Sequence, residues 1–287
     1  MEDIYGSDGD QKHQSHKPEY EIIGSLGTLC NNDDIVSIIK GSDLCNAYGL
    51  DAISAGATIA FAMDLFDRGI ISEEDAEMDL SWGNAESILN MLEKIGERQG
   101  FGDVLADGVQ AAAEKIGKGS EAYAYHVRVQ ERPLHDPKYY PAFAVAYHID
   151  DTPGRHMHNN AWAVICPAEW LSGIGVEGAD REAIEGQGKN YMVLSAMSHF
   201  VNASGACQFG WWSNDASYMY QFVEAVTGMH FDKDKARRAG ERIANMRHAF
   251  NLREGLNPRE WSYPGIMVGD PPIGVGPLGD VTIDIET

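Results

Sequence analysis

The assignment of the fold starts from one stretch, Asn202-Ala203-Ser204-Gly205-Ala206-Cys207, because an earlier stretch has nearly the same pattern: Asn46-Ala47-Tyr48-Gly49-Leu50-Asp51. In both, Asn comes first, Ala second, Gly fourth, an apolar residue fifth, and an acid or a thiol sixth. Each borders an apolar run with helical spacing. Glycine at the fourth position allows a turn that brings the backbone close to a ligand. We therefore expect two equivalent loops at helix ends that face one shared ligand.

The composition is that of an ordinary globular protein with an acidic surface. The 287 residues are 44% hydrophobic and 23% charged, and the formal net charge is -22. Nucleic acids and anionic membranes require a basic face on their partner, so the charge argues against both as partners. The acidity itself indicates a solvated surface.

Apolar residues recur at helical spacing over most of the chain, so the expected fold class is mainly α, multihelical, with two helical domains. Residues 123–129 alternate and resemble a strand. Residues 132–137 read as a linker. We therefore expect a polar tail at 1–17, a helical domain at 18–135, and a second helical domain at 136–287 that ends in an extended segment rich in Pro and Gly. Polar side chains at four positions suit helix N-caps: Asp34, Ser72 with Asp75, Asn84 and Asp232.

Cellular location is indicated by the N-terminus, the longest apolar stretch and the cysteines. The N-terminus lacks the basic and apolar regions of a signal peptide. The apolar stretch at 49–66 is interrupted by Asp51 and Asp64, which predicts a buried helix and no membrane span. The cysteines have no CxxC spacing, which favours a reducing, cytoplasmic compartment over a disulfide framework. They are Cys30, Cys45, Cys166 and Cys207.

Two segments are candidates for chemistry, each with a plain alternative. Glu21 precedes a Gly-rich apolar turn; it is either a surface charge or a carboxylate in a pocket, where burial would raise its pKa and make it a proton shuttle. His156 follows Thr152-Pro153-Gly154-Arg155 after an apolar run; it is either solvated on a surface turn or a donor in a site loop.

Six segments together carry a family resemblance. They are Pro18-Glu19-Tyr20-Glu21, Cys45-Asn46-Ala47-Tyr48-Gly49-Leu50-Asp51 with Ile53-Ser54, the run from Gly100 to Gly108, Leu134-His135-Asp136-Pro137, Ser204-Gly205-Ala206-Cys207, and Phe250-Asn251-Leu252-Arg253-Glu254-Gly255. In order and spacing they resemble the tungsten-containing aldehyde ferredoxin oxidoreductases, over roughly residues 18 to 270. The resemblance implies the two multihelical C-terminal domains that close over a tungstopterin.

The resemblance also implies site residues. In the family, two motifs of the form Asp-x-x-Gly-Leu-(Asp/Cys) contact the two pterins. Here Asn replaces the leading Asp in both copies, which keeps an acceptor oxygen, and Ala replaces the Leu of the second. The implied cofactor-binding residues are Asn46, Leu50, Asp51, Asn202, Ala206 and Cys207, and Cys207 is also the implied [4Fe-4S] ligand. Glu21 matches the family's catalytic acid and His156 its histidine, with His158 as the alternative because the loop length differs.

The implied function is oxidation of an aldehyde to a carboxylic acid with ferredoxin as electron acceptor, using a tungsten or molybdenum pterin and a [4Fe-4S] cluster. The family's other three cluster ligands and its pterin-binding N-terminal domain have no counterpart in the sequence. We therefore expect a fragment or split subunit, inactive alone, that needs an N-terminal domain or subunit and is compatible with a homo-oligomer. Two alternatives stay open: the tungsten subunit of an aromatic acyl-CoA reductase, and a cofactor-free, non-catalytic helical fragment.

Overall fold

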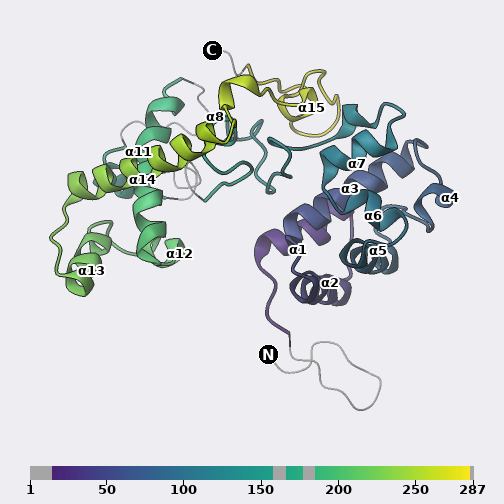
Figure 1. Cartoon of the computed structure of the whole chain (residues 1–287), viewed down its shortest axis with the longest axis horizontal. Helices are drawn as coiled ribbons and strands as arrows, with labels where there is room; N and C mark the ends of the chain where they lie inside the picture. The colour runs from purple at the N-terminus through teal and green to yellow at the C-terminus, as the bar shows by residue number, and fades with distance from the viewer. Residues whose placement is uncertain (1–14, 158–165, 177–184, 285–287) are drawn as a thin grey trace. The chain divides into compact units, whose positions relative to one another are not determined.

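The computed structural model describes residues 15–157, 166–176 and 185–284, and it is built from helices (Figure 1). Within these ranges there is no strand, and the β pairing consists of one isolated bridge between Val127 and Gln130. The predicted mainly α class is confirmed. The strand-like reading of residues 123–129 was wrong: Arg128 and Val129 have φ of 47° and 69°, so the chain turns back on itself there.

The chain divides into two compact units, which are described separately. The first comprises the described residues up to Leu134 together with Pro264–Ile266, and the second comprises His135–Tyr263 and the described residues from Met267 onward. The division between Leu134 and His135 lies next to the boundary expected between residues 135 and 136.

The first unit is a helical cluster organised around one buried helix. That helix, α3 (Ala52–Asp67), has small residues where α1 (Tyr20–Leu26) packs on it: a Cβ added at Gly56 would lie 2.7 Å from Ser25. Helix α2 (Ile35–Tyr48) packs against α5 (Ala85–Glu97). The remaining elements are η1 (Thr28–Cys30), α4 (Glu73–Ala76), α6 (Phe101–Leu105), α7 (Val109–Ile116) and η2 (Ser120–Tyr123).

Two glycines of this unit differ in their effect on helix continuity. Helix α2 continues through Gly41 to Tyr48, because Gly41 fits closely under Leu26 and leaves the helix unbroken. Helices α6 and α7, in contrast, do not join into one. They are separated at Gly108, whose φ of 89° interrupts the helix.

Among the described residues, no single helix has the length and hydropathy to cross a membrane. The neighbouring helices α2 and α3 meet that criterion only as a pair, by length and composition, and they are bent by 117° where they join.

The second unit is organised around two long helices, α11 (Gln187–Ser204) and α14 (Lys233–Arg253). They pack closely, because a Cβ at Gly240 of α14 would collide with the backbone oxygen of Ala196 in α11. Helix α8 (Ala142–Ile149) packs on α11 as well. The other elements are α10 (Ala168–Ile174), α12 (Gln208–Trp212), α13 (Tyr218–Thr227), η3 (Pro258–Glu260) and α15 (Gly265–Val268), whose first residues belong to the first unit.

Candidate functional site

The two repeated stretches fold into the same turn. In the first, α2 ends at Tyr48, Gly49 has φ of 70°, and Asp51 is the N-cap of α3. In the second, α11 ends at Ser204, Gly205 has φ of 74°, and Cys207 is the N-cap of α12. Residues with side chains adopt such φ values at a cost, which explains glycine at the fourth position of both.

We call these the first turn (residues 46–51) and the second turn (residues 202–207). In both, the first and sixth residues are exposed and the fifth is half-buried. Apart from each glycine's own chain neighbours, no atom of the described residues lies within 4 Å of the position that a Cβ on either turn glycine would take. Each turn therefore presents open backbone and polar side chains that a ligand can approach.

The first turn lines a cavity of about 350 Å³ within the first unit, with both polar and apolar side chains in its wall. Asp51 Oδ1 accepts a hydrogen bond from the Ser54 amide at 2.9 Å, so its carboxylate caps α3. On the opposite wall, Oε1 of the buried Glu131 accepts from the Val109 amide at 2.6 Å. Burial raises the pKa of Glu131 above its ordinary value. The cavity thus combines three acids, Asp51, Asp107 and Glu131, with the hydroxyls of Ser54 and Thr58.

The second turn lines an apolar cavity of about 450 Å³ within the second unit. Ala206 lies in its wall, opposite side chains such as Met219 and Phe222, and no charged residue lines it. Beside the cavity, Asn202 Oδ1 accepts from Gln208 Nε2 at 2.9 Å, which ties the end of α11 to the start of α12.

Cys207 differs from the other cysteines in its exposure. All four are free thiols, but the other three are buried. Burial raises the pKa of Cys30 to about 12, and burial together with the charge of Asp51 raises that of Cys45 to about 12. The side chain of Cys207 makes no capping hydrogen bond to α12. It is therefore the one cysteine whose thiol is presented for ligation.

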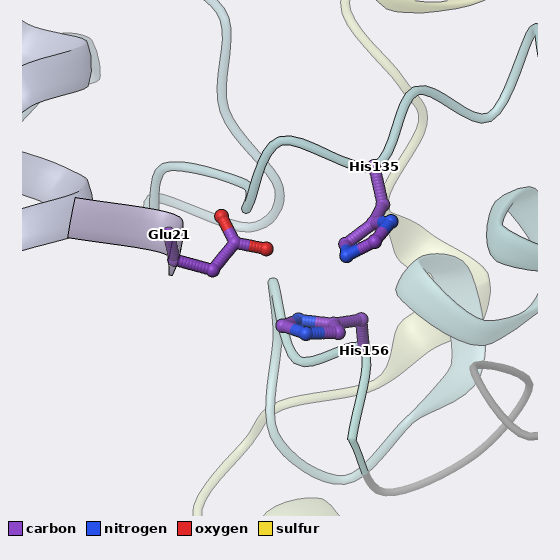
Figure 2. A group of neighbouring side chains, drawn as sticks. All are labelled: Glu21, His135 and His156. Carbon is purple, nitrogen blue, oxygen red and sulfur yellow. The ribbon is translucent and has the colours of Figure 1, made fainter. Parts of the chain in front are cut away.

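Glu21 is a buried carboxylate on α1, with an exposed fraction of 5% (Figure 2). Its Oε2 accepts a hydrogen bond from the backbone amide of Leu134 at 3.0 Å. The Leu134 side chain meanwhile lies against Gly24, one turn further along α1. Of the two alternatives drawn from the sequence, the structure has the buried carboxylate.

His156 is also buried, with an exposed fraction of 7%, in the turn that follows α8. Its ring lies on that of His135, with centroids 4.5 Å apart and planes 39° apart (Figure 2). His135 packs in turn on Phe143 of α8, at 5.1 Å between centroids. The alternative histidine, His158, lies outside the described residues.

His135 was missed as a functional candidate from the sequence. It stood in the predicted linker, and nothing local indicated that its ring would meet one 21 positions further along the chain. It directly follows Leu134, the residue whose amide Glu21 binds. The residue that binds the Glu21 carboxylate, Leu134, and the residue that packs on His156, His135, are therefore consecutive in the chain.

The fold and the two turns define a multihelical protein with a duplicated helix–glycine–helix turn, one copy in each unit. The chain belongs to the aldehyde ferredoxin oxidoreductase family, domains 2 & 3, which matches residues 3–286. The resemblance recognised in the sequence is thereby confirmed.

Relatives of this chain include larger proteins. It is 31% identical over 263 residues to the tungsten-containing aldehyde ferredoxin oxidoreductase of Pyrococcus horikoshii, covering 90% of this chain and 42% of that protein. It is 36% identical over 118 residues to the aliphatic sulfonate oxidoreductase, WOR-like subunit, of Pyrococcus furiosus, covering 40% of this chain and 19% of the relative. The chain thus spans about two fifths of the length of the aldehyde oxidoreductases it matches.

A solved structure shares the fold. It is the active site complex BamBC of benzoyl coenzyme A reductase in complex with 1,5-dienoyl-CoA, with a TM-score of 0.65 and 23% identity. The match covers 91% of this chain and 44% of the solved one. At this identity the likeness establishes the arrangement of the helices alone.

Proposed function

We propose that this chain is the helical part of an oxidoreductase that converts aldehydes to carboxylic acids, with a tungstopterin, a [4Fe-4S] cluster and ferredoxin as electron acceptor. One observation carries the proposal: each unit presents the same open glycine turn, in a family named for this activity. An N-terminal domain or subunit completes the enzyme in this proposal, because the chain spans only part of its relatives.

The residues of the first turn fit a pterin. A pterin ring presents a row of N–H donors and ring acceptors, and the cavity beside the first turn offers carboxylate and hydroxyl groups in about 350 Å³. Asn46 and Asp51 would hold one pterin, with Leu50 against its ring. At the second turn, Asn202 and Ala206 would serve the other. Tungsten and molybdenum bind the same pterin sulfurs, so the choice of metal lies outside these residues.

Cys207 fits one ligand of an iron-sulfur cluster. Such clusters are held by four thiolates, and each other cysteine of the chain is buried. Three further thiolates would therefore come from the N-terminal part. Four free cysteines also agree with a reducing compartment, which we propose is the cytoplasm.

When bound, the tungsten centre and the cluster would supply the redox chemistry, which is acceptance of two electrons and their transfer to ferredoxin. Oxidation of an aldehyde adds the oxygen of one water and releases two electrons and two protons. Glu21 Oε2 would take one of these protons, since a buried carboxylate beside a backbone donor is held in a fixed orientation. His156, fixed by its contact with His135, would donate a hydrogen bond to the aldehyde oxygen.

Elemental mass spectrometry of the purified protein tests the proposal. The chain is expressed with tungstate and molybdate supplied, alone and together with an N-terminal part from a relative. We expect iron and tungsten or molybdenum in the assembled complex, together with aldehyde-dependent reduction of ferredoxin. Absence of both metals from the chain and from the complex would contradict the proposal and favour a cofactor-free helical fragment.

A further inference from the structure

A buried charged cluster in the second unit lies at the turn that carries His156 and has no role in the proposed function. Its centre is Asp151, whose side chain is 1% exposed. His199, 2% exposed, places Nε2 at 3.2 Å from Asp151 Oδ1, and Arg247 forms an ion pair with Oδ2 through Nε. The three residues follow or belong to three different elements: Asp151 comes just after α8, His199 is in α11 and Arg247 is in α14.

Two more hydrogen bonds fasten the same turn to α14. Arg247 donates from its terminal nitrogen to Thr152 Oγ1 at 2.6 Å, and Asn251 Nδ2 donates to the backbone oxygen of Asp151 at 2.7 Å. The turn is also closed on itself, because Asp150 Oδ1 accepts from the Thr152 amide at 3.0 Å. The start of the turn is therefore held, through its side chains and its backbone, by side chains of the two long helices α11 and α14.

The hydrogen bonds of His199 fix its charge. Nδ1 lies 2.7 Å from the backbone oxygen of Ser195 and 3.4 Å from its hydroxyl, and Nε2 faces a carboxylate. The nearest partner of each ring nitrogen is an acceptor, which favours a proton on both nitrogens and therefore the imidazolium form. Burial alone would lower the pKa of His199, but Asp151, the Ser195 carbonyl and Asp150 raise it.

The cluster balances its charges internally. Burial alone would raise the pKa of Asp151, but hydrogen bonds from His199 and Asp150 and the charge of Arg247 hold it well below its usual range. The preceding residue, Asp150, is a second buried carboxylate, and its Oδ2 accepts a hydrogen bond from the hydroxyl of Tyr191 at 3.2 Å. A buried carboxylate is tolerated when cations and donors surround it, and removal of one partner leaves an uncompensated charge.

We propose that Asp151 is a positioning residue: paired with His199 and Arg247, it fixes the turn at residues 152–157 and thereby holds the His156 ring on His135. The importance of this for catalysis rests on the proposed function, whereas the positioning itself does not. Only four residues separate Asp151 from His156, so a turn anchored at its start leaves the ring few other places to lie.

The test uses the full chain with isotope-labelled histidine and NMR spectroscopy. In Asp151→Asn, the pKa of His199 should fall, the ring signals of His156 and His135 should shift and broaden, and amide exchange at residues 154–156 should quicken at least tenfold. The matched control is Asp232→Ala, which removes the N-cap carboxylate that accepts from Lys235 at the start of α14. It should lower the melting temperature and leave both ring signals in place.

Unchanged signals of His156 and His135 in Asp151→Asn, with a melting temperature lowered as in the control, would overturn the proposal. If Asp151→Asn does not fold, the half-exposed Arg247 replaces it as the test position. Arg247→Met should then shift the signals of the His156 and His135 rings, whereas Arg247→Lys, which keeps the positive charge, should leave them close to their natural positions. Equal shifts in the two variants would also overturn the proposal. The NMR test needs no cofactor, so its result is independent of the metal analysis. Failure of the positioning proposal can therefore be told apart from failure of the proposed function.

Discussion

The first and second turns share a backbone and differ in what their sixth residue does. In the first turn, Asp51 uses its carboxylate to cap the helix that follows. In the second turn, Cys207 stands at the same N-cap position and its side chain makes no such bond. The two turns thus share their glycine geometry, and one has a capping carboxylate where the other has an exposed thiol.

The cavities beside the two turns also differ, in the polarity of the side chains that line them. The cavity at the first turn has carboxylates and hydroxyls among its lining groups, whereas the lining of the cavity at the second turn is mostly apolar and carries no charged residue. In the proposed function, the first turn would therefore bind the polar edge of a ligand by hydrogen bonds. The second turn would bind an apolar face, or a metal cluster through the sulfur of Cys207.

The largest expected effect is on iron content, when the sixth residue of each turn is replaced by Ser. In the complex with the N-terminal part, Cys207→Ser should lose nearly all of its iron, because a serine hydroxyl is a poor substitute for a cluster thiolate. Asp51→Ser in the first turn should keep its iron. Iron is measured per protein by mass spectrometry and by visible absorbance, and full iron in Cys207→Ser would reject the ligand assignment.

Because the two turn glycines have the same backbone conformation, we expect replacing either one to have a similar effect on the free energy of unfolding. Gly49→Val and Gly205→Val should each lower the free energy of unfolding by about 1–2 kcal/mol, because a β-branched residue is strained at positive φ. Gly→Asn at the same positions should cost less, since Asn tolerates this conformation. Urea denaturation measures both, and a loss confined to one turn would break their equivalence.

The capping difference predicts an asymmetry in stability. Asp51→Ala should lower the free energy of unfolding by about 1 kcal/mol through loss of the N-cap of α3. Cys207→Ala should change it by less than about 0.5 kcal/mol, as expected for an exposed side chain that caps nothing. Equal losses in urea denaturation would mean that the thiol stabilises α12 after all.

The smallest effect concerns the buried acid at the first turn. The pKa of Glu131 is raised in the folded protein, so its stabilising contribution is present below the ordinary glutamate pKa and is lost as pH rises through the raised value. Glu131→Gln keeps an acceptor for the Val109 amide and does not titrate. Its urea midpoint relative to the natural protein should therefore increase from acidic to neutral pH.

The control for this pH dependence is Glu114→Gln, which changes an exposed acid on α7. If the urea midpoint of Glu131→Gln varied with pH no more than that of Glu114→Gln, burial would not hold the Glu131 proton.

Local signals explain how much of the fold could be predicted from the sequence. The expected N-caps Asp34, Asn84 and Asp232 each accept a backbone hydrogen bond, and Ser72 with Asp75 forms a capping box. These patterns lie within a few residues of the helices they begin, so a sequence contains them directly. The same holds for the turn glycines, whose role follows from conformation alone.

Interactions between distant residues explain what could not be predicted. The break between α6 and α7 comes with Glu131 binding the Val109 amide, 22 residues away. The burial of Glu21 depends on Leu134, which is 113 residues further on. The imidazole pair joins His135 and His156, which are 21 positions apart. No local pattern encodes such pairs; they arise only once the helices have packed.

The short return of the chain, Pro264–Ile266, has a consequence for dissecting the protein. These residues belong to the first unit although 129 residues of the second precede them, and the Tyr125 hydroxyl donates to the Ile266 oxygen at 2.9 Å. A fragment that stops at Leu134 therefore lacks part of its own unit. A single proteolytic cut after Leu134 would nick the polypeptide without separating it into two complete halves. The C-terminal piece would remain fastened to the N-terminal one by three of its residues.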